Sequence, residues 1–222
     1  MSWIQTFTGK KVFPFAMTPD QVCIEDIAHA LALKCRFTGH CKRFYSIAEH
    51  SVRVSWLVRP EVQLAALLHD AAEAYLPDFA RPLKGKAYFK LNKEPQASAV
   101  DKHYFRSEST DDGEHTFKVN LHNTDRFAFV CTGVYSAKSV EASILGVIWS
   151  ALSVGSFSSA SIMFADDILL ATEARDLMGP PPEPWALDVP VLPETIEPWT
   201  AEKAEQEFLR VYRGLTREKA AV

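Results

Sequence analysis

Residues 46–75 read SIAEHSVRVSWLVRPEVQLAALLHDAAEAY, and their apolar side chains recur every three or four positions on both sides of Pro60. At 3.6 residues per turn these positions share one helix face, so the stretch predicts two amphipathic helices, about 46–58 and 61–75. Pro60 ends the first helix, because proline cannot continue the backbone hydrogen bonding. The pattern favours an all-α fold.

Other parts of the chain extend this helical prediction. Apolar spacing predicts three further helices, which complete the expected helical bundle. Two other segments are expected to be non-helical. The helices span about residues 20–34, 165–178 and the stretch after Thr200, a short extended arm or hairpin is expected at 3–14, and a proline-rich strap at 180–198.

Composition narrows the class of protein. The chain has 222 residues, 47% hydrophobic and 23% charged, which fits one folded domain over residues 1–222. A net charge of −4 does not favour nucleic acid or an anionic membrane as partner. The four cysteines form no C-x-x-C pair, which argues against zinc fingers and a disulfide framework and favours a reducing cytoplasm.

The central segment, about residues 85–164, gives the weakest signal. Residues 85–141 mix polar residues with a few aromatics, and the cluster from Ser107 to Gly113 predicts a polar loop. Residues 142–165 carry no charge, but their serines and glycines predict a buried or loosely ordered segment rather than a membrane span. We therefore expect an atypical central segment or insertion.

Two histidines and two aspartates in the predicted helices suggest a metal-binding site. His50 and His69 lie on the apolar stripes of successive helices, Asp70 follows His69 directly, and Asp166 begins a later helix. One buried histidine is ordinary, but two with two carboxylates would leave charge uncompensated at a cost of several kcal/mol. Imidazoles with carboxylates suit Mn²⁺, Co²⁺, Fe²⁺, Ni²⁺ or Zn²⁺, and Mg²⁺ is kept as a further candidate.

These residues also resemble a known family. Glu49-His50-Ser51, His69-Asp70-Ala71-Ala72-Glu73 and Ala165-Asp166 are similar to the H…HD…D signature of HD-domain metal-dependent phosphohydrolases. The resemblance is closest to the phage and bacterial branch that contains dATP triphosphohydrolases and 5′-deoxynucleotidases. It covers about residues 1–90 and 165–215, and Arg36-Phe37-Thr38-Gly39-His40 strengthens it.

The resemblance implies a role for each matched residue. The metal ligands would be His50, His69, Asp70 and Asp166. The candidate catalytic acids are Glu73, which would orient or deprotonate the attacking water, and Asp78. The substrate-binding candidates are Arg36, Phe37 and Lys84. Glu73 as a structural pairing group and Lys84 as a solvated lysine stay open as alternatives.

One departure concerns the fourth ligand. Asp70 and Asp166 are separated by a longer connection than in the relatives, so Asp125 is the fallback ligand. Asp166 is preferred because the residues after it continue the family's helix.

The resemblance implies a divalent-metal-dependent phosphohydrolase of nucleotides, either a dNTP triphosphohydrolase of the dATP type or a 5′-deoxynucleotidase. The alternatives are a catalytically weakened metal- or nucleotide-binding regulatory module and a hydrolase of a signalling nucleotide. We expect a cytoplasmic protein with a small nucleotide substrate, no nucleic-acid or membrane partner, and an oligomeric state, homo-oligomer included, that the sequence leaves open.

Overall fold

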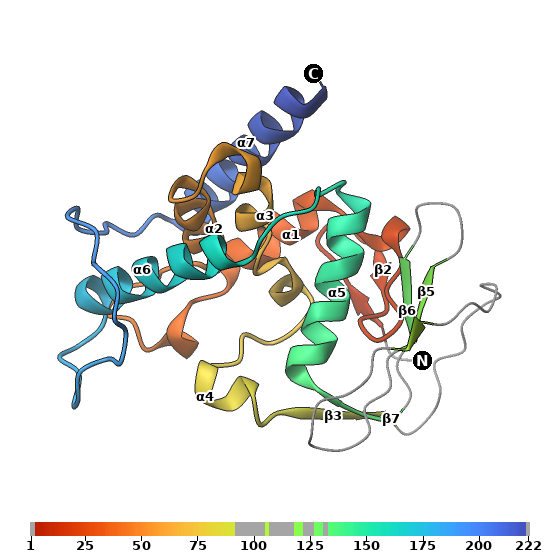
Figure 1. Cartoon of the computed structure of the whole chain (residues 1–222), viewed down its shortest axis with the longest axis horizontal. Coiled ribbons are helices and arrows are strands. Elements are labelled where there is room, and N and C mark those ends of the chain that lie inside the picture. The colour runs from red at the N-terminus through yellow and green to blue at the C-terminus, as the bar shows by residue number, and fades with distance from the viewer. Residues whose placement is uncertain (1–2, 92–104, 107–117, 122–126, 131–132, 221–222) are drawn as a thin grey trace. The chain divides into compact units, whose positions relative to one another are not determined.

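The computed structural model describes residues 3–91, 105–106, 118–121, 127–130 and 133–220, and these are mainly helical (Figure 1). This confirms the predicted helical class. The chain divides into two compact units, one of residues 1–26 and 71–154 and the other of residues 27–70 and 155–222. Each unit is thus built from segments far apart in the sequence.

The first unit contains short strands as well as helices. Its elements are β1 (Ile4–Gln5), β2 (Lys11–Val12), η1 (Pro19–Gln21), η4 (Ala71–Ala74), α4 (Arg81–Lys84), β3 (Tyr88–Leu91), β4 (Phe105–Arg106), β5 (Lys118–Leu121), β6 (Phe127–Val130), β7 (Gly133–Ser136) and α5 (Ala137–Ala151). Strands β1 and β2 pair antiparallel and form the predicted hairpin. The pairs β3–β7, β4–β5 and β5–β6 are also antiparallel and lie where no strand was predicted. The predicted loop at 107–113 lies outside the described residues.

Helix α5 was not predicted. Four buried apolar residues, Val140, Ile144, Val147 and Ile148, follow a helical repeat, and α5 packs against η1 and η4 of the same unit. Ser136 begins the helix by accepting a hydrogen bond from the amide of Ser139. Serines and glycines between the apolar positions hid this repeat in the sequence. Of the two alternatives for residues 142–165, the buried segment is confirmed and the loosely ordered one was wrong for residues up to 151.

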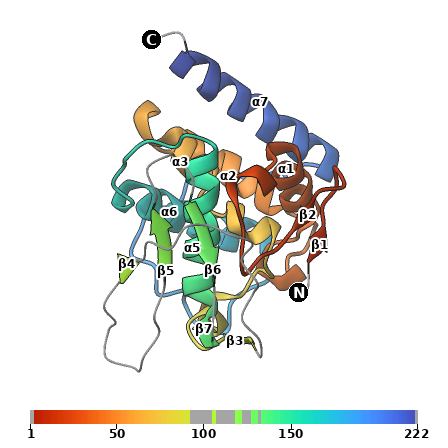
Figure 2. The same cartoon turned by 90° about the vertical axis from the view of Figure 1, so that its right-hand side faces the viewer.

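The second unit is a group of helices around α2. Helix α1 (Ile24–Leu33) enters it at residue 27. Its other elements are η2 (Phe37–Gly39), α2 (Ile47–Trp56), η3 (Pro60–Val62), α3 (Gln63–Leu67), α6 (Ala160–Leu177) and α7 (Ala201–Ala220). Helix α2 packs against α3, α6 and α7, and Figures 1 and 2 show α7 running past α2. Helix α2 is therefore the centre of this unit.

Helix α2 begins where the sequence indicates. The buried Ser46 hydroxyl accepts a hydrogen bond from the amide of Glu49 at 3.0 Å, which satisfies one of the free amides of the first turn. Most of α2 is buried, including its polar residues Glu49 and His50. The Glu49 carboxylate accepts hydrogen bonds from Arg53 on its own helix and from the backbone amide of Trp199.

The expectation of one helix over 61–75 was wrong. Helix α3 ends at Leu67, and the chain turns before η4 begins at Ala71. In this turn the amide of His69 bonds to the carbonyl of Ala66 at 3.4 Å, and the His69 ring donates from Nδ1 to the same carbonyl at 2.7 Å. The side chain thereby gives this carbonyl at the helix end a second, shorter hydrogen bond.

The proline-rich strap joins α6 to α7 without a helix or strand of its own in residues 179–200. Arg175 of α6 donates to the carbonyls of Leu192 and Glu194, and Asp176 accepts from the amide of Ile196. These contacts hold the strap against the end of α6. Helix α6 itself begins at Ala160, five residues before the predicted start.

None of the helices within the described ranges combines the length and the apolar character that crossing a membrane requires.

We expect the Ser46→Ala variant to lower the free energy of unfolding by about 1 kcal/mol, because the buried amide of Glu49 would lose its acceptor. Chemical denaturation monitored by circular dichroism measures this change. Ser161→Ala, at an exposed position of α6, is the matched control and should leave stability nearly unchanged. Equal stability of both variants would show that the cap does not anchor α2.

Candidate metal centre

Two histidines and two aspartates from three parts of the second unit come together. His50 lies in the middle of α2 and is fully buried. His69 and Asp70 lie in the turn after α3, and Asp166 lies on α6. Because α2 packs against both α3 and α6, these elements bring side chains together that are far apart in the chain.

The distances among the four side chains are short. The Nε2 atoms of His50 and His69 are 3.4 Å apart. His50 Nε2 lies 3.2 Å from Asp166 Oδ1 and 3.7 Å from Asp70 Oδ2, and His69 Nε2 lies 3.3 Å from the same Asp70 oxygen. His50, His69 and Asp166 each offer one ligand atom within a space that could hold a metal ion.

The other ring nitrogen of each histidine is already engaged. His50 Nδ1 bonds to the Glu173 carboxylate at 2.7 Å, and His69 Nδ1 bonds to the carbonyl of Ala66 at 2.7 Å. Both acceptors favour a proton on Nδ1, so in the neutral form of each ring Nε2 is the nitrogen that offers a lone pair to a metal ion. Metal-binding histidines are commonly oriented in this way, so the group could hold a metal ion.

Glu173 joins the histidine to an arginine. It is fully buried, accepts from Arg36 Nε at 3.1 Å, and lies on α6 two turns after Asp166. Arg36 NH1 also lies 3.7 Å from Asp70 Oδ2. The three carboxylates outnumber this one guanidinium, so the group attracts a further positive charge, either a proton or a metal ion.

The pKa shifts of Asp166, Glu173 and His50 also result from the charges that are buried together in this group. Burial alone would raise the pKa of the Asp166 carboxyl, but the hydrogen bond and charge of His50 lower it well below its ordinary value. Burial would also raise the pKa of Glu173, and the charges of Arg36 and His50 lower it. Burial and Arg36 lower the pKa of His50, yet Glu173 and Asp166 outweigh them and raise it to about 9. Surplus negative charge thus dominates the group.

Of the predicted substrate-binding residues, Arg36 contacts this group through Glu173 and Asp70, and Phe37 is its neighbour in the chain. The Arg36 guanidinium lies 5.5 Å from the centre of the Phe37 ring, and that ring packs edge-to-face on Trp185 of the strap at 6.1 Å. The Arg36 side chain is already paired with Glu173, so it is held in place by the protein itself.

Glu73, Asp78 and Lys84 belong to the first unit. Lys84 Nζ lies 2.6 Å from Glu141 of α5 and 3.7 Å from the largely buried Glu73. Asp78 is half-buried in the segment after η4. Their predicted roles stay predictions, and Asp125, the fallback ligand, lies outside the described residues.

Two carboxylates of these clusters were missed in the sequence. Glu173 follows Asp166 by seven positions, which places both on one face of a helix, and this spacing could have revealed it. Glu141 lies in the central segment, where no helix was predicted. Nothing in the sequence therefore indicated that Glu141 pairs with Lys84.

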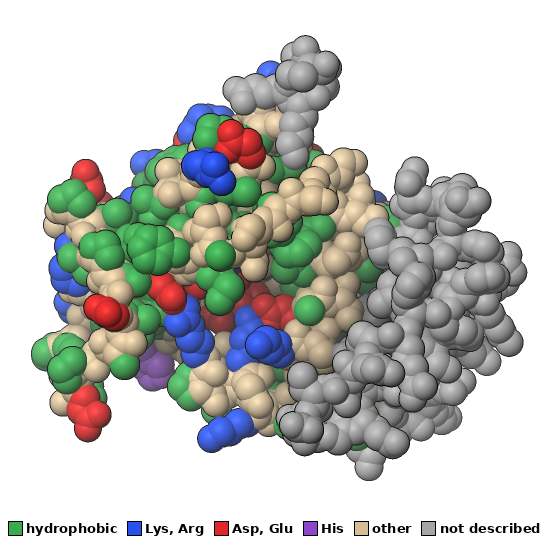
Figure 3. All heavy atoms as spheres, viewed as in Figure 1, with side chains coloured by type: hydrophobic (Ala, Val, Ile, Leu, Met, Phe, Trp, Pro, Cys, Tyr) green, Lys and Arg blue, Asp and Glu red, His purple; other side chains and the backbone are tan. Residues whose placement is uncertain are grey.

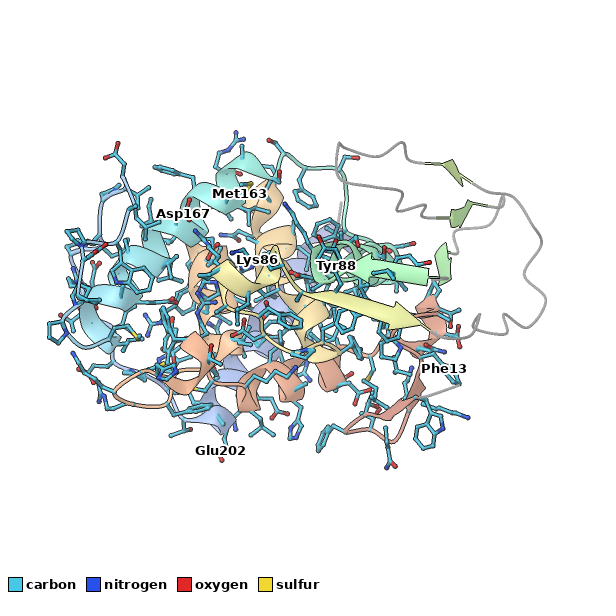
Figure 4. All side chains as sticks on the ribbon, turned by 90° about the horizontal axis from the view of Figure 1, so that it is seen from below. Phe13, Lys86, Tyr88, Met163, Asp167 and Glu202 are labelled. Atoms are coloured by element: carbon cyan, nitrogen blue, oxygen red, sulfur yellow. The ribbon has the colours of Figure 1, made fainter. Side chains whose placement is uncertain are left out.

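Helix α6 also carries a residue, Asp167, that can serve as a control for Asp166. Figure 4 labels Asp167 and Met163, one turn apart on α6, and Met163 is strongly exposed. Figure 3 shows apolar side chains over the outside of α6. Asp167 is half-buried and adjacent to Asp166, so it is a matched control for that residue.

Comparison with known proteins finds two relatives and no matching family model. The chain is 48% identical over 84 residues to the uncharacterized protein YfdR of Escherichia coli K12, covering 38% of this chain and 47% of YfdR. It is 39% identical over 103 residues to an uncharacterized protein of Rhodobacter capsulatus, covering 41% of this chain and 53% of that protein. The chain thus spans about half the length of the curated relatives it matches, and their names state no activity.

We expect the His50→Ala and His69→Ala variants to lose Mn²⁺ binding, because each removes an inward Nε2 atom. Isothermal titration of the metal-free protein with Mn²⁺ measures this, with about one ion per chain for the unmodified protein. His40→Ala, at an exposed position, should bind as the unmodified protein does. Retention of binding by both variants would show that the metal group is misassigned.

The Glu173→Gln variant should bind Mn²⁺ about 10- to 100-fold more weakly. The side chain keeps its shape but loses its charge, and its amide N–H₂ would face the donors of either Arg36 or His50. The same titration measures the change, and thermal unfolding checks that the variant folds. An unaltered affinity would show that Glu173 does not position His50.

Proposed function

We propose that the chain is a divalent-metal-dependent phosphohydrolase of the HD-domain superfamily that acts on nucleotides. More narrowly, we propose a dNTP triphosphohydrolase of the dATP type or a 5′-deoxynucleotidase. The observation that carries the proposal is the convergence of His50 and His69, with Nε2 atoms 3.4 Å apart, beside carboxylates at 3.2 to 3.7 Å.

The residues present fit a divalent ion of the first transition row. Two imidazole nitrogens and two carboxylates form a mixed nitrogen and oxygen donor set, which suits Mn²⁺, Co²⁺, Fe²⁺, Ni²⁺ or Zn²⁺. When bound, such an ion supplies Lewis acidity, which polarises a phosphoryl oxygen and lowers the pKa of a water molecule. Ligands to it would be His50, His69, Asp70 and Asp166.

The remaining residues would act on water and substrate. Glu73 follows Asp70 by three positions and is the candidate to orient the attacking water or accept its proton. Asp78 is the second candidate acid. Arg36 and Lys84 would neutralise phosphate charge, and Phe37 would contact the sugar or base. Lys84 lies against Glu141 and Glu73, so a phosphate would compete with these carboxylates for it.

An assay of nucleotide hydrolysis tests the proposal and distinguishes among the candidate substrates. Purified protein is incubated with Mn²⁺ or Co²⁺ and each dNTP and dNMP, with guanosine tetraphosphate and cyclic nucleotides included, and the products are separated by chromatography. Release of triphosphate from a dNTP or of phosphate from a dNMP would support one of the two narrower assignments. Metal and nucleotide binding without turnover would instead identify a regulatory module.

We expect Asp166→Asn to reduce turnover at least 100-fold, because the amide replaces an anionic ligand next to His50. Asp167→Asn should retain most of the activity, since it changes the adjacent carboxylate of the same helix. The measurement is the initial rate at saturating metal. Equal rates for both variants would contradict the assignment of Asp166.

A further inference from the structure

Two thiols lie close together at the loop that carries Arg36. The Sγ atoms of Cys35 and Cys41 are 3.9 Å apart, and both residues are partly accessible to solvent. The sulfurs of a disulfide are about 2.05 Å apart, so joining these two requires a shift of roughly 2 Å. The five residues between them would form a small closed ring.

The loop between the thiols has an unusual backbone. Phe37 and Thr38 both have positive φ, 55° and 53°, and Gly39 follows with 80°. Residues other than glycine reach this left-handed region at a cost of about 1 to 3 kcal/mol each. A rearrangement that releases this backbone strain would offset part of the free-energy cost of moving Cys41 toward Cys35.

Backbone hydrogen bonds hold both ends of the loop, and on the Cys41 side the amide of Lys42 donates to the carbonyl of Leu177 at 2.8 Å. Cys35 pairs with Ser46 in an isolated β-bridge, and the amide of Arg36 donates to the carbonyl of Tyr45 at 2.9 Å. The Cys41 thiol donates to the carbonyl of Arg36 at 3.2 Å. Disulfide formation would remove this donor and pull Cys41 across the Arg36 backbone.

Any displacement of Arg36 reaches the candidate metal centre. Its guanidinium bonds to Glu173, which in turn holds His50. The same guanidinium lies 3.7 Å from Asp70. Three contacts, Cys41 to Arg36, Arg36 to Glu173 and Glu173 to His50, therefore connect a thiol with a candidate metal ligand.

We propose that Cys35 and Cys41 form a redox-active dithiol, which a small disulfide such as oxidised glutathione converts to an intramolecular disulfide, and that this reaction displaces Arg36. The Cys35 sulfur attacks oxidised glutathione, whose S–S bond breaks, and one glutathione leaves as a thiol. The Cys41 sulfur then attacks the mixed disulfide and releases the second. Two electrons pass to glutathione and both thiol protons end on the two glutathione molecules.

The surroundings of the thiols favour this order of attack. Burial, followed by the neighbouring Cys35, raises the pKa of the Cys41 thiol to about 12. Cys41 is thus a protonated donor to the Arg36 carbonyl in the reduced protein, which leaves Cys35 as the first nucleophile.

Peptide mapping tests the disulfide without any assay of activity. The full-length protein is equilibrated with oxidised glutathione, free thiols are alkylated, and trypsin then cuts after Lys34, Arg36 and Lys42. We expect residues 35–36 and 37–42 to stay linked and to separate only after dithiothreitol. Cys41→Ser should abolish the linkage, and Cys23→Ser should preserve it. Alkylation of both thiols in the treated protein would overturn the proposal.

The effect on Arg36 is tested by turnover, and this part rests on the proposed function. We expect the disulfide form to hydrolyse its nucleotide at least about 10-fold more slowly, because displaced positioning groups cost large factors in rate. Dithiothreitol should restore the rate, and Cys35→Ser, which lacks the first nucleophile, should be insensitive to oxidised glutathione. A mapped disulfide with unchanged turnover would overturn the link to Arg36. Absence of turnover in both redox states would count against the proposed function, while the mapping decides the disulfide independently.

Discussion

The buried carboxylate of Glu173 is the contact on which the candidate centre depends. It lies in a fully buried position, where an isolated charge would be costly. Its partners are Arg36 on one oxygen and His50 on the other, at 3.1 Å and 2.7 Å. A single side chain thus balances the charge of the arginine and orients the histidine. The inward direction of His50 Nε2 follows from this bond.

Local periodicity in the sequence predicted much of the second unit. The start of α2 at Ser46 and the helices near residues 20–34, 165–178 and 201 onward all follow from apolar spacing and capping chemistry, which act over one or two turns. The break after Leu67 was not predictable in this way. It depends on the His69 ring, which bonds to the carbonyl of Ala66 and so competes with the continued helix.

The first unit shows where such reasoning fails. Antiparallel strands β3 and β7 pair residues 88–91 with 133–136, and this pairing joins positions that no local pattern relates. In the candidate centre, His69-Asp70 was visible because its residues are adjacent in sequence. The pairing of Lys84 with Glu141 was hidden, because it joins two segments of which the second had no predicted structure.

The second unit is closed by two stretches that are separated by residues 71–154. The chain leaves it directly after Asp70 and returns before α6, so closing the unit costs the entropy of bringing two chain ends together. That entropy grows with the logarithm of loop length, about 0.6 kcal/mol for each doubling. On this scale the length of the connection between Asp70 and Asp166 can vary at a small cost in free energy to the approach of the four candidate ligands.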